Sequence, residues 1–166
     1  MLRQRVITAL VMAGAFVAAI VFLPLPALAL VFGILVGAGG WEWSRLAGLQ
    51  PGLSRALYVA VLLACMGALY VFCNLGGQPV KEQVQPFLGL ACLWWSFALL
   101  WIRGYPGSAA LWSHRPMRCL MGLLILAPAW MAAVFLLSFP RGGLLIFVMV
   151  LTVATADIGA YFSGKQ

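Results

Sequence analysis

Six long apolar runs divide this chain, and they constrain its fold more than any other feature of the sequence. They cover residues 6–23, 27–43, 56–72, 87–102, 119–139 and 144–162. Each run is close to the ~17–25 residues that an α-helix needs to cross the ~30 Å hydrocarbon core of a bilayer. A segment in lipid must satisfy its own backbone hydrogen bonds, so each run is predicted to be helical. The sequence therefore predicts an all-α, polytopic membrane protein with about six transmembrane helices, forming one integral membrane domain over residues 1–166.

The balance of residue types supports this class and argues against a soluble protein. Hydrophobic residues make up 65% of the chain and charged residues 8%, whereas a soluble domain is typically about half apolar and about a quarter charged. The formal net charge is +7, but the basic residues are scattered singly and in pairs between the apolar runs. Because no basic patch lies on a soluble scaffold, we expect the lipid bilayer, and no nucleic acid, as a partner.

The positions of the basic residues predict the topology. If the N-terminus is cytoplasmic, the cytoplasmic loops and ends hold Arg3, Arg5, Arg45, Arg55, Arg103, Arg115, Arg118 and Lys165. The opposite side holds Lys81 and Arg141. This asymmetry follows the positive-inside rule and predicts six spans with both termini cytoplasmic. A cleaved signal peptide is the alternative for the first run, but that run is longer than the usual ~7–15-residue apolar core of such peptides.

Small and aromatic residues suggest how the helices pack. Two predicted helices carry small residues at every fourth position, Gly33 and Gly37 on one and Ala156, Ala160 and Gly164 on the other. That spacing places them on one face, and such faces let helices approach closely in lipid. We therefore interpret them as packing surfaces. Trp41 and Trp43, at the end of the second run, are interpreted as anchors at the membrane interface.

The three acidic residues differ in their surroundings. Glu82 lies beside Lys81 in a loop, and Glu42 lies three residues before Arg45, so a local ion pair is its expected partner. Asp157 lies inside the last apolar run, about 10 Å from the predicted cytoplasmic face at ~1.5 Å per residue. A carboxylate in hydrocarbon costs about 2–4 kcal/mol or more, which makes Asp157 a functional-site hypothesis. A structural hydrogen bond to a neighbouring helix is the alternative.

The single histidine, His114, lies in a proline-containing loop with Arg115 and Arg118 nearby. Proline and charge favour a solvated loop. The alternative is a contact between these cationic groups and the phosphate of an anionic lipid, which basic residues at a membrane face attract.

Three stretches carry a more specific pattern. The chain opens with MLRQRVITA, accompanied by Trp41-Glu42-Trp43; residues 105–112 read YPGSAALW; and residues 156–165 read ADIGAYFSGK. Together they resemble the phosphatidate cytidylyltransferase family, the bacterial CDP-diacylglycerol synthases, over the N-terminal portion of that family. The third stretch is the most specific and is similar to the family's A-D-[ST]-G-A-Y-x-x-G-[KR] segment, with Ile158 in place of the Ser or Thr.

The resemblance implies a nucleotidyltransferase of phospholipid biosynthesis, located in the bacterial inner membrane as a multi-pass protein. Its partners would be CTP and phosphatidic acid, which react to CDP-diacylglycerol and pyrophosphate, and its cofactor would be Mg²⁺. Asp157 would be a catalytic residue and metal ligand, and Lys165 would bind a substrate phosphate. A homodimer is an open alternative for the assembled state.

One departure from the family pattern bears on activity. The family also carries a C-terminal signature with a K-D pair and an H-G-G-x-x-D-R-x-D run, which holds most of its acids, and residues 1–166 contain no such run. We therefore expect this chain to lack the family's C-terminal catalytic region and to be incomplete or inactive as it stands. Two alternatives remain open: a non-catalytic, truncated membrane module, and a small transporter that uses Asp157.

Overall fold

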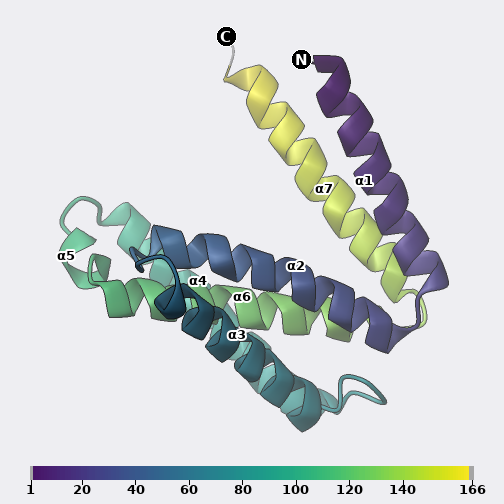
Figure 1. The fold of residues 1–166 in the computed structure, drawn as a ribbon, viewed down its shortest axis with the longest axis horizontal. Helices are drawn as coiled ribbons and strands as arrows, with labels where there is room; N and C mark the ends of the chain where they lie inside the picture. Colours follow the sequence, from purple (N-terminus) through teal and green to yellow (C-terminus); the bar gives the residue numbers. More distant parts are fainter. Residues whose placement is uncertain (1, 165–166) are drawn as a thin grey trace.

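The computed structural model describes the backbone of residues 2–164, and regular structure in that range is helical (Figure 1). The side chains of residues 1–6, 9, 10, 162, 165 and 166 are outside the description. The helices are α1 (Leu2–Phe22), α2 (Leu25–Leu46), α3 (Leu53–Phe72), α4 (Lys81–Arg103), α5 (Ala109–Trp112), α6 (Arg115–Leu137) and α7 (Gly142–Ser163). The predicted all-α class is confirmed, and each apolar run lies within one of the long helices except for one or two residues at an end.

Five helices are long and apolar enough to cross a membrane, judged on the described residues: α2, α3, α4, α6 and α7. In α1 the corresponding described segment, Val11–Phe22, is shorter, although the helix itself has 21 residues. The polytopic architecture is thus confirmed with five such helices and α1 beside them. The short helix α5, in the loop between α4 and α6, was not predicted.

Helices α2, α3, α4 and α6 alternate in direction, so their basic ends gather at one end of the bundle (Figure 1). Arg45 lies in the last turn of α2, Arg55 in the first turn of α3, Arg103 at the end of α4, and Arg115 at the start of α6. We call this end, together with α5, the arginine end. Lys81, which begins α4, and Arg141, which precedes α7, lie at the opposite ends of their helices. The alternation required by the predicted topology is present, while its orientation in a membrane stays a prediction.

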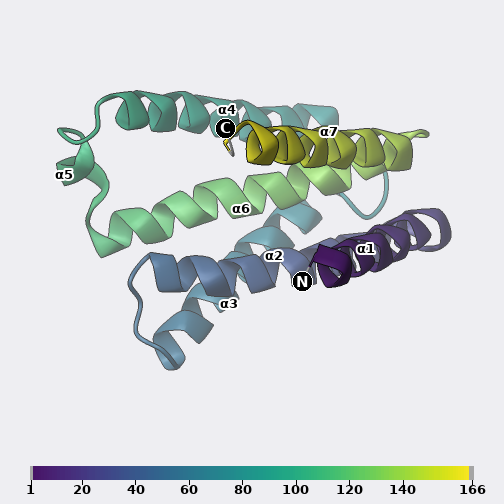
Figure 2. The same ribbon diagram turned by 90° about the horizontal axis from the view of Figure 1, so that it is seen from above.

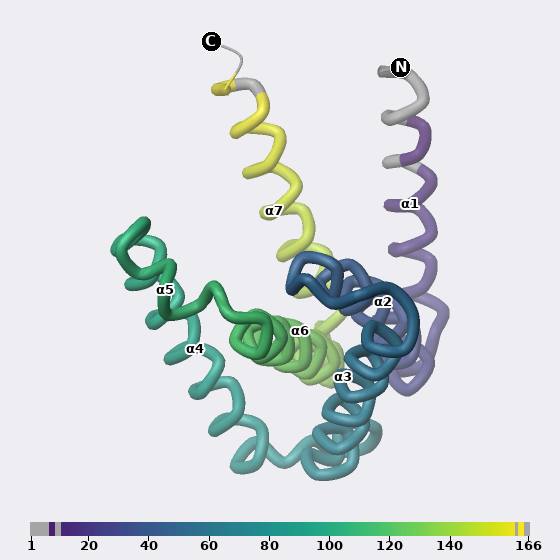
Figure 3. The backbone as a smooth tube through the Cα atoms, turned by 60° about the vertical axis from the view of Figure 1, so that its left-hand side comes forward, coloured from purple at the N-terminus to yellow at the C-terminus, as the bar shows by residue number. Residues whose placement is uncertain are grey.

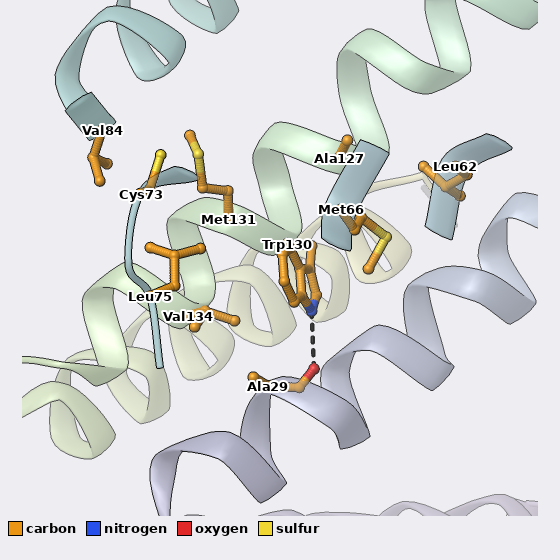
Figure 4. Close-up of a cluster of buried hydrophobic side chains, with 10 residues drawn as sticks. All are labelled: Ala29, Leu62, Met66, Cys73, Leu75, Val84, Ala127, Trp130, Met131 and Val134. Carbon is orange, nitrogen blue, oxygen red and sulfur yellow. Dashed lines mark hydrogen bonds between the residues drawn. The ribbon is translucent and has the colours of Figure 1, made fainter. Parts of the chain in front are cut away.

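Helix α6 is the centre of the bundle. It packs against α2, α3 and α4, and it lies between α4 and the α2–α3 pair in two different views (Figures 2 and 3). The buried cluster in Figure 4 joins these helices, and in it the Trp130 indole Nε1 donates a hydrogen bond to the Ala29 carbonyl oxygen at 3.0 Å. A Cβ at Gly33 would lie 3.6 Å from that Nε1, and one at Gly37 would lie 3.6 Å from Leu63 Cδ2. The predicted packing role of Gly33 and Gly37 is confirmed.

Helices α1 and α7 both lean away from the bundle, with their outer ends on the same side of the molecule (Figures 1 and 3). Helix α7 contacts the rest of the molecule mainly through its start, where Gly142 and Ile146 are buried. From Phe147 onward every described α7 side chain is exposed. The prediction that Ala156, Ala160 and Gly164 form a packing face is therefore wrong for the described structure, because the part of α7 that carries them extends beyond the neighbouring helices.

Candidate functional site

Asp157 lies in the exposed second half of α7, and its side chain is exposed. The described residues show no hydrogen bond or ion pair to its carboxylate. They also contain no group of three His, Cys, Asp or Glu side chains that could hold a metal ion. Lys165, the predicted phosphate contact, lies outside the described residues. The structure therefore supplies one carboxylate from the third sequence stretch, on a helix face that no described element covers.

This arrangement bears on the expected Mg²⁺. Magnesium in phosphate-transfer sites is commonly held by one or two carboxylates together with substrate phosphates and water. The described residues bring no three potential ligands together, and the other two acids, Glu42 and Glu82, lie in α2 and α4, so these residues do not by themselves make a magnesium site. Any ion held by Asp157 would need further ligands from the substrate or from other protein segments.

Glu42, the other acid near a helix end, has a local partner as predicted. Its Oε2 lies 4.0 Å from Arg45 Nη1, and the two side chains are 70% and 71% exposed. Exposed pairs of this kind contribute roughly 0–1 kcal/mol to stability. The pair confirms the expected role of Glu42. Glu82 is exposed as expected, but it lies in the first turn of α4 and not in a loop, because that helix begins at Lys81.

The arginine end contains a more connected group of side chains, centred on the first turns of α6. The Trp43 indole Nε1 donates to the Arg118 carbonyl oxygen at 2.8 Å, and the Tyr58 hydroxyl donates to the Cys119 carbonyl oxygen at 3.2 Å. These bonds join α2 and α3 to α6. Trp43 is thus a link between helices, which the interpretation as an interface anchor missed, because its acceptor lies 75 residues away in sequence.

Arg118 is hydrogen-bonded to the backbone of the loop before α6 and lies close to the backbone at the end of α2. Its Nη2 donates to the Ser113 carbonyl oxygen at 2.7 Å, and its Nη1 lies 3.5 Å from the Leu46 carbonyl oxygen. His114 and Arg115 are exposed, which agrees with the predicted solvated loop. Arg118 differs from them because it is partly buried and bonded to backbone.

A cavity of about 180 Å³ lies beside Arg118, and we call it the Trp112–Arg118 cavity. Its lining residues come from the end of α2, from α5 and from the start of α6: Trp43, Leu46, Ala47, Trp112, Arg118 and Met121. Trp43 belongs to the Trp-Glu-Trp stretch and Trp112 ends the YPGSAALW stretch. The fold thus brings two of the three stretches together, while the stretch with Asp157 lies apart on α7 (Figure 1).

The fold and these sites show that the chain is an all-helical polytopic protein. Its basic helix ends gather at one end, and an isolated acid lies in its last helix. Comparison with known proteins then places it more closely. The sequence profile of the cytidylyltransferase family matches residues 3–166, and the chain belongs to that family.

Two curated relatives have the same printed name. The phosphatidate cytidylyltransferase of Pseudomonas aeruginosa is 44% identical over 166 residues, which cover 99% of this chain and 58% of that protein. The phosphatidate cytidylyltransferase of Haemophilus influenzae is 33% identical over 177 residues, with 99% and 61% covered. The chain therefore spans about 60% of the length of these relatives. No solved structure gives a significant match.

Proposed function

We propose that this chain works in the transfer of a cytidylyl group from CTP to phosphatidic acid, in the phospholipid synthesis of a bacterial inner membrane. The observation that carries the proposal is the match to the cytidylyltransferase family over residues 3–166, with two relatives that are phosphatidate cytidylyltransferases. In the reaction a phosphate oxygen of the lipid would bond to the α-phosphorus of CTP, and the bond from that phosphorus to pyrophosphate would break.

Asp157 and Lys165 are the site residues of this proposal. Both belong to the stretch at residues 156–165, which has the family's pattern at the aspartate and at the basic residue. Lys165 would bind a phosphate group as a point charge. Asp157 would act at the nucleotide phosphates, and its isolated position on α7 fits a residue completed by other groups. Mg²⁺ would neutralise phosphate charge when bound, and no step is assigned to it, since Asp157 alone does not form its site.

A chimera tests the proposal. Residues 1–166 replace the aligned segment of the Pseudomonas aeruginosa relative, and membranes containing the chimera are assayed for incorporation of labelled CTP into lipid. We expect incorporation well above that of membranes without it. A chimera that is present in the membrane in normal amounts and gives no incorporation would contradict the proposal.

Membranes containing residues 1–166 alone form the second arm of this experiment. Incorporation in that arm would show that these residues suffice for the reaction. An active chimera beside an inactive short chain would show that the chain contributes to the site but needs other segments. Inactivity in both arms would favour the alternative of a non-catalytic membrane module.

A further inference from the structure

We propose that residues 104–113, which connect α4 to α6 and include α5, lie in the headgroup layer of an anionic membrane and bind its surface. We call these residues the interface segment, and they form the outer edge of the arginine end (Figures 1 and 2). The inference does not rest on the transferase activity, because it follows from the position, backbone hydrogen bonds, exposed side chains and charge of the segment.

The two helices beside the interface segment set its depth. Helices α4 and α6 have 23 residues each, a length of about 34 Å at ~1.5 Å per residue. Both are candidate membrane spans, and the hydrocarbon core of a bilayer is ~30 Å thick. A helix of this length ends close to the edge of the core. The segment, which follows Arg103 and precedes His114, therefore begins and ends in the headgroup layer.

The backbone of the interface segment is largely hydrogen-bonded to itself. The Ser108 hydroxyl also donates to the Trp101 carbonyl oxygen at 2.6 Å, which ties the segment to the end of α4. Unsatisfied backbone groups are what keeps irregular chain out of lipid, so this bonding lets the segment leave bulk water. The backbone N–H groups that donate to carbonyl oxygens within the segment or at the end of α4 include those of Gly104, Tyr105, Ser108, Ala109, Leu111 and Ser113.

Large apolar side chains are exposed on and beside the interface segment. Tyr105 is 66% exposed, Leu111 is 60% exposed, and Ile102, in the last turn of α4, is 70% exposed. Such surface is unfavourable in water, and on a connection between spans it has no hydrocarbon core around it. The headgroup layer offers the lipid contact instead, and tyrosine is enriched at that depth. These side chains thus lie against lipid, with the segment flat on the membrane.

The charge around the interface segment selects an anionic surface. Arg103 precedes the segment, His114 and Arg115 follow it, and all three are exposed. Residues 83–156 contain no Asp or Glu, so no acid near the segment in sequence offsets this charge. Basic residues at a membrane face attract anionic headgroups, and the aliphatic part of an arginine can lie along apolar surface while its guanidinium reaches the headgroups. An anionic leaflet therefore fits the segment better than a zwitterionic one.

Two exposed residues report on this arrangement in the unaltered protein: Tyr105, and His114, the single histidine of the chain. The protein is labelled with ring-¹³C tyrosine and histidine and placed in nanodiscs of phosphatidylglycerol and phosphatidylcholine. The Tyr105 ring protons, assigned by their loss in Tyr105→Phe, should be broadened by a lipid nitroxide at the top of the acyl chain. A gadolinium chelate in water should broaden the His114 ring protons more. Equal broadening of both residues by the chelate would place Tyr105 in water and overturn the proposal.

Nanodiscs of phosphatidylcholine alone test the charge. The chelate should broaden the Tyr105 signal more strongly in them, because Arg103 and Arg115 no longer meet anionic headgroups. Equal protection of Tyr105 in the two membranes would overturn the selection of an anionic surface.

Leu111→Ser tests the apolar contact. It should shift the ratio of membrane-bound to water-exposed segment roughly tenfold toward water, because a leucine loses its lipid contact. The readout is stronger broadening of Tyr105 by the chelate. Because Leu111 is exposed in the fold, thermal unfolding of this variant in detergent should stay close to that of the wild type.

Leu53→Ser is the matched control. Leu53 is 75% exposed in the first turn of α3, so it also lies at the arginine end but outside the interface segment. The Tyr105 signal of this variant should respond to the chelate as in the wild type. Equal effects of the two substitutions, or no effect of Leu111→Ser, would overturn the proposal.

Discussion

The Trp43 indole Nε1 and the Arg118 carbonyl oxygen are 2.8 Å apart, and this hydrogen bond joins the end of α2 to the first turn of α6. It also holds two walls of the Trp112–Arg118 cavity together, because both residues line it. Trp43→Phe keeps an aromatic ring but removes the donor, so the free energy of unfolding should fall by about 1 kcal/mol. Thermal unfolding of the purified chain measures this.

Trp41→Phe is the control for that prediction. Trp41 is 42% exposed, and no hydrogen bond from its indole is seen within the described structure. Its substitution should change stability by no more than about 0.5 kcal/mol, as for most surface positions. If Trp41→Phe destabilised the chain as much as Trp43→Phe does, the bond to Arg118 would not be the reason for the loss.

Gly122, on α6, leaves the space that the side chains of Trp43 and Tyr58 occupy against this helix. A Cβ at this position would overlap the Tyr58 hydroxyl and the Trp43 indole, and both side chains are held by hydrogen bonds to α6. Gly122→Ala should therefore cost about 1–3 kcal/mol, in the range measured for overpacked interiors. Gly67→Ala, on α3, has nothing within 4 Å of the new Cβ and should be neutral or mildly stabilising. Melting temperatures of the two variants would show the difference, and equal values would contradict it.

The exposed face of α7 yields a third prediction, which depends on the proposed function. Ala160 is exposed and shares its face with Ala156, so Ala160→Leu should leave the thermal unfolding of residues 1–166 unchanged. In the chimera, where further segments can cover α7, the same substitution should lower CTP incorporation, because small faces permit close helix approach. Full activity of the Ala160→Leu chimera would mean that nothing packs closely against this face.

Local sequence patterns predicted the elements of this fold well, because their causes are local. The lengths of the apolar runs predicted the long helices, and the spacing of three residues between Glu42 and Arg45 predicted their ion pair. The position of Trp43 and Trp112 beside one cavity was missed because it depends on how α2, α5 and α6 meet, and no local spacing encodes that meeting. The one available signal was that both residues lie in stretches that carry the family resemblance.

The candidate site was predicted less completely than the fold. The sequence singled out Asp157 as an acid in an apolar helix, and the structure places it on an exposed helix face, with no group of three potential metal ligands among the described residues. Which groups complete the site depends on contacts between segments, so spacing along one helix could not reveal it.

CTP incorporation by the chimera with Asp157→Asn tests the central claim most directly. Asparagine keeps the size of the side chain and removes its charge, so incorporation should fall about a hundredfold or more if the carboxylate acts at the nucleotide phosphates. Glu82→Gln, which neutralises an exposed acid at the start of α4, should leave incorporation unchanged. An Asp157→Asn chimera that incorporates CTP as fast as the Glu82→Gln chimera would contradict the account.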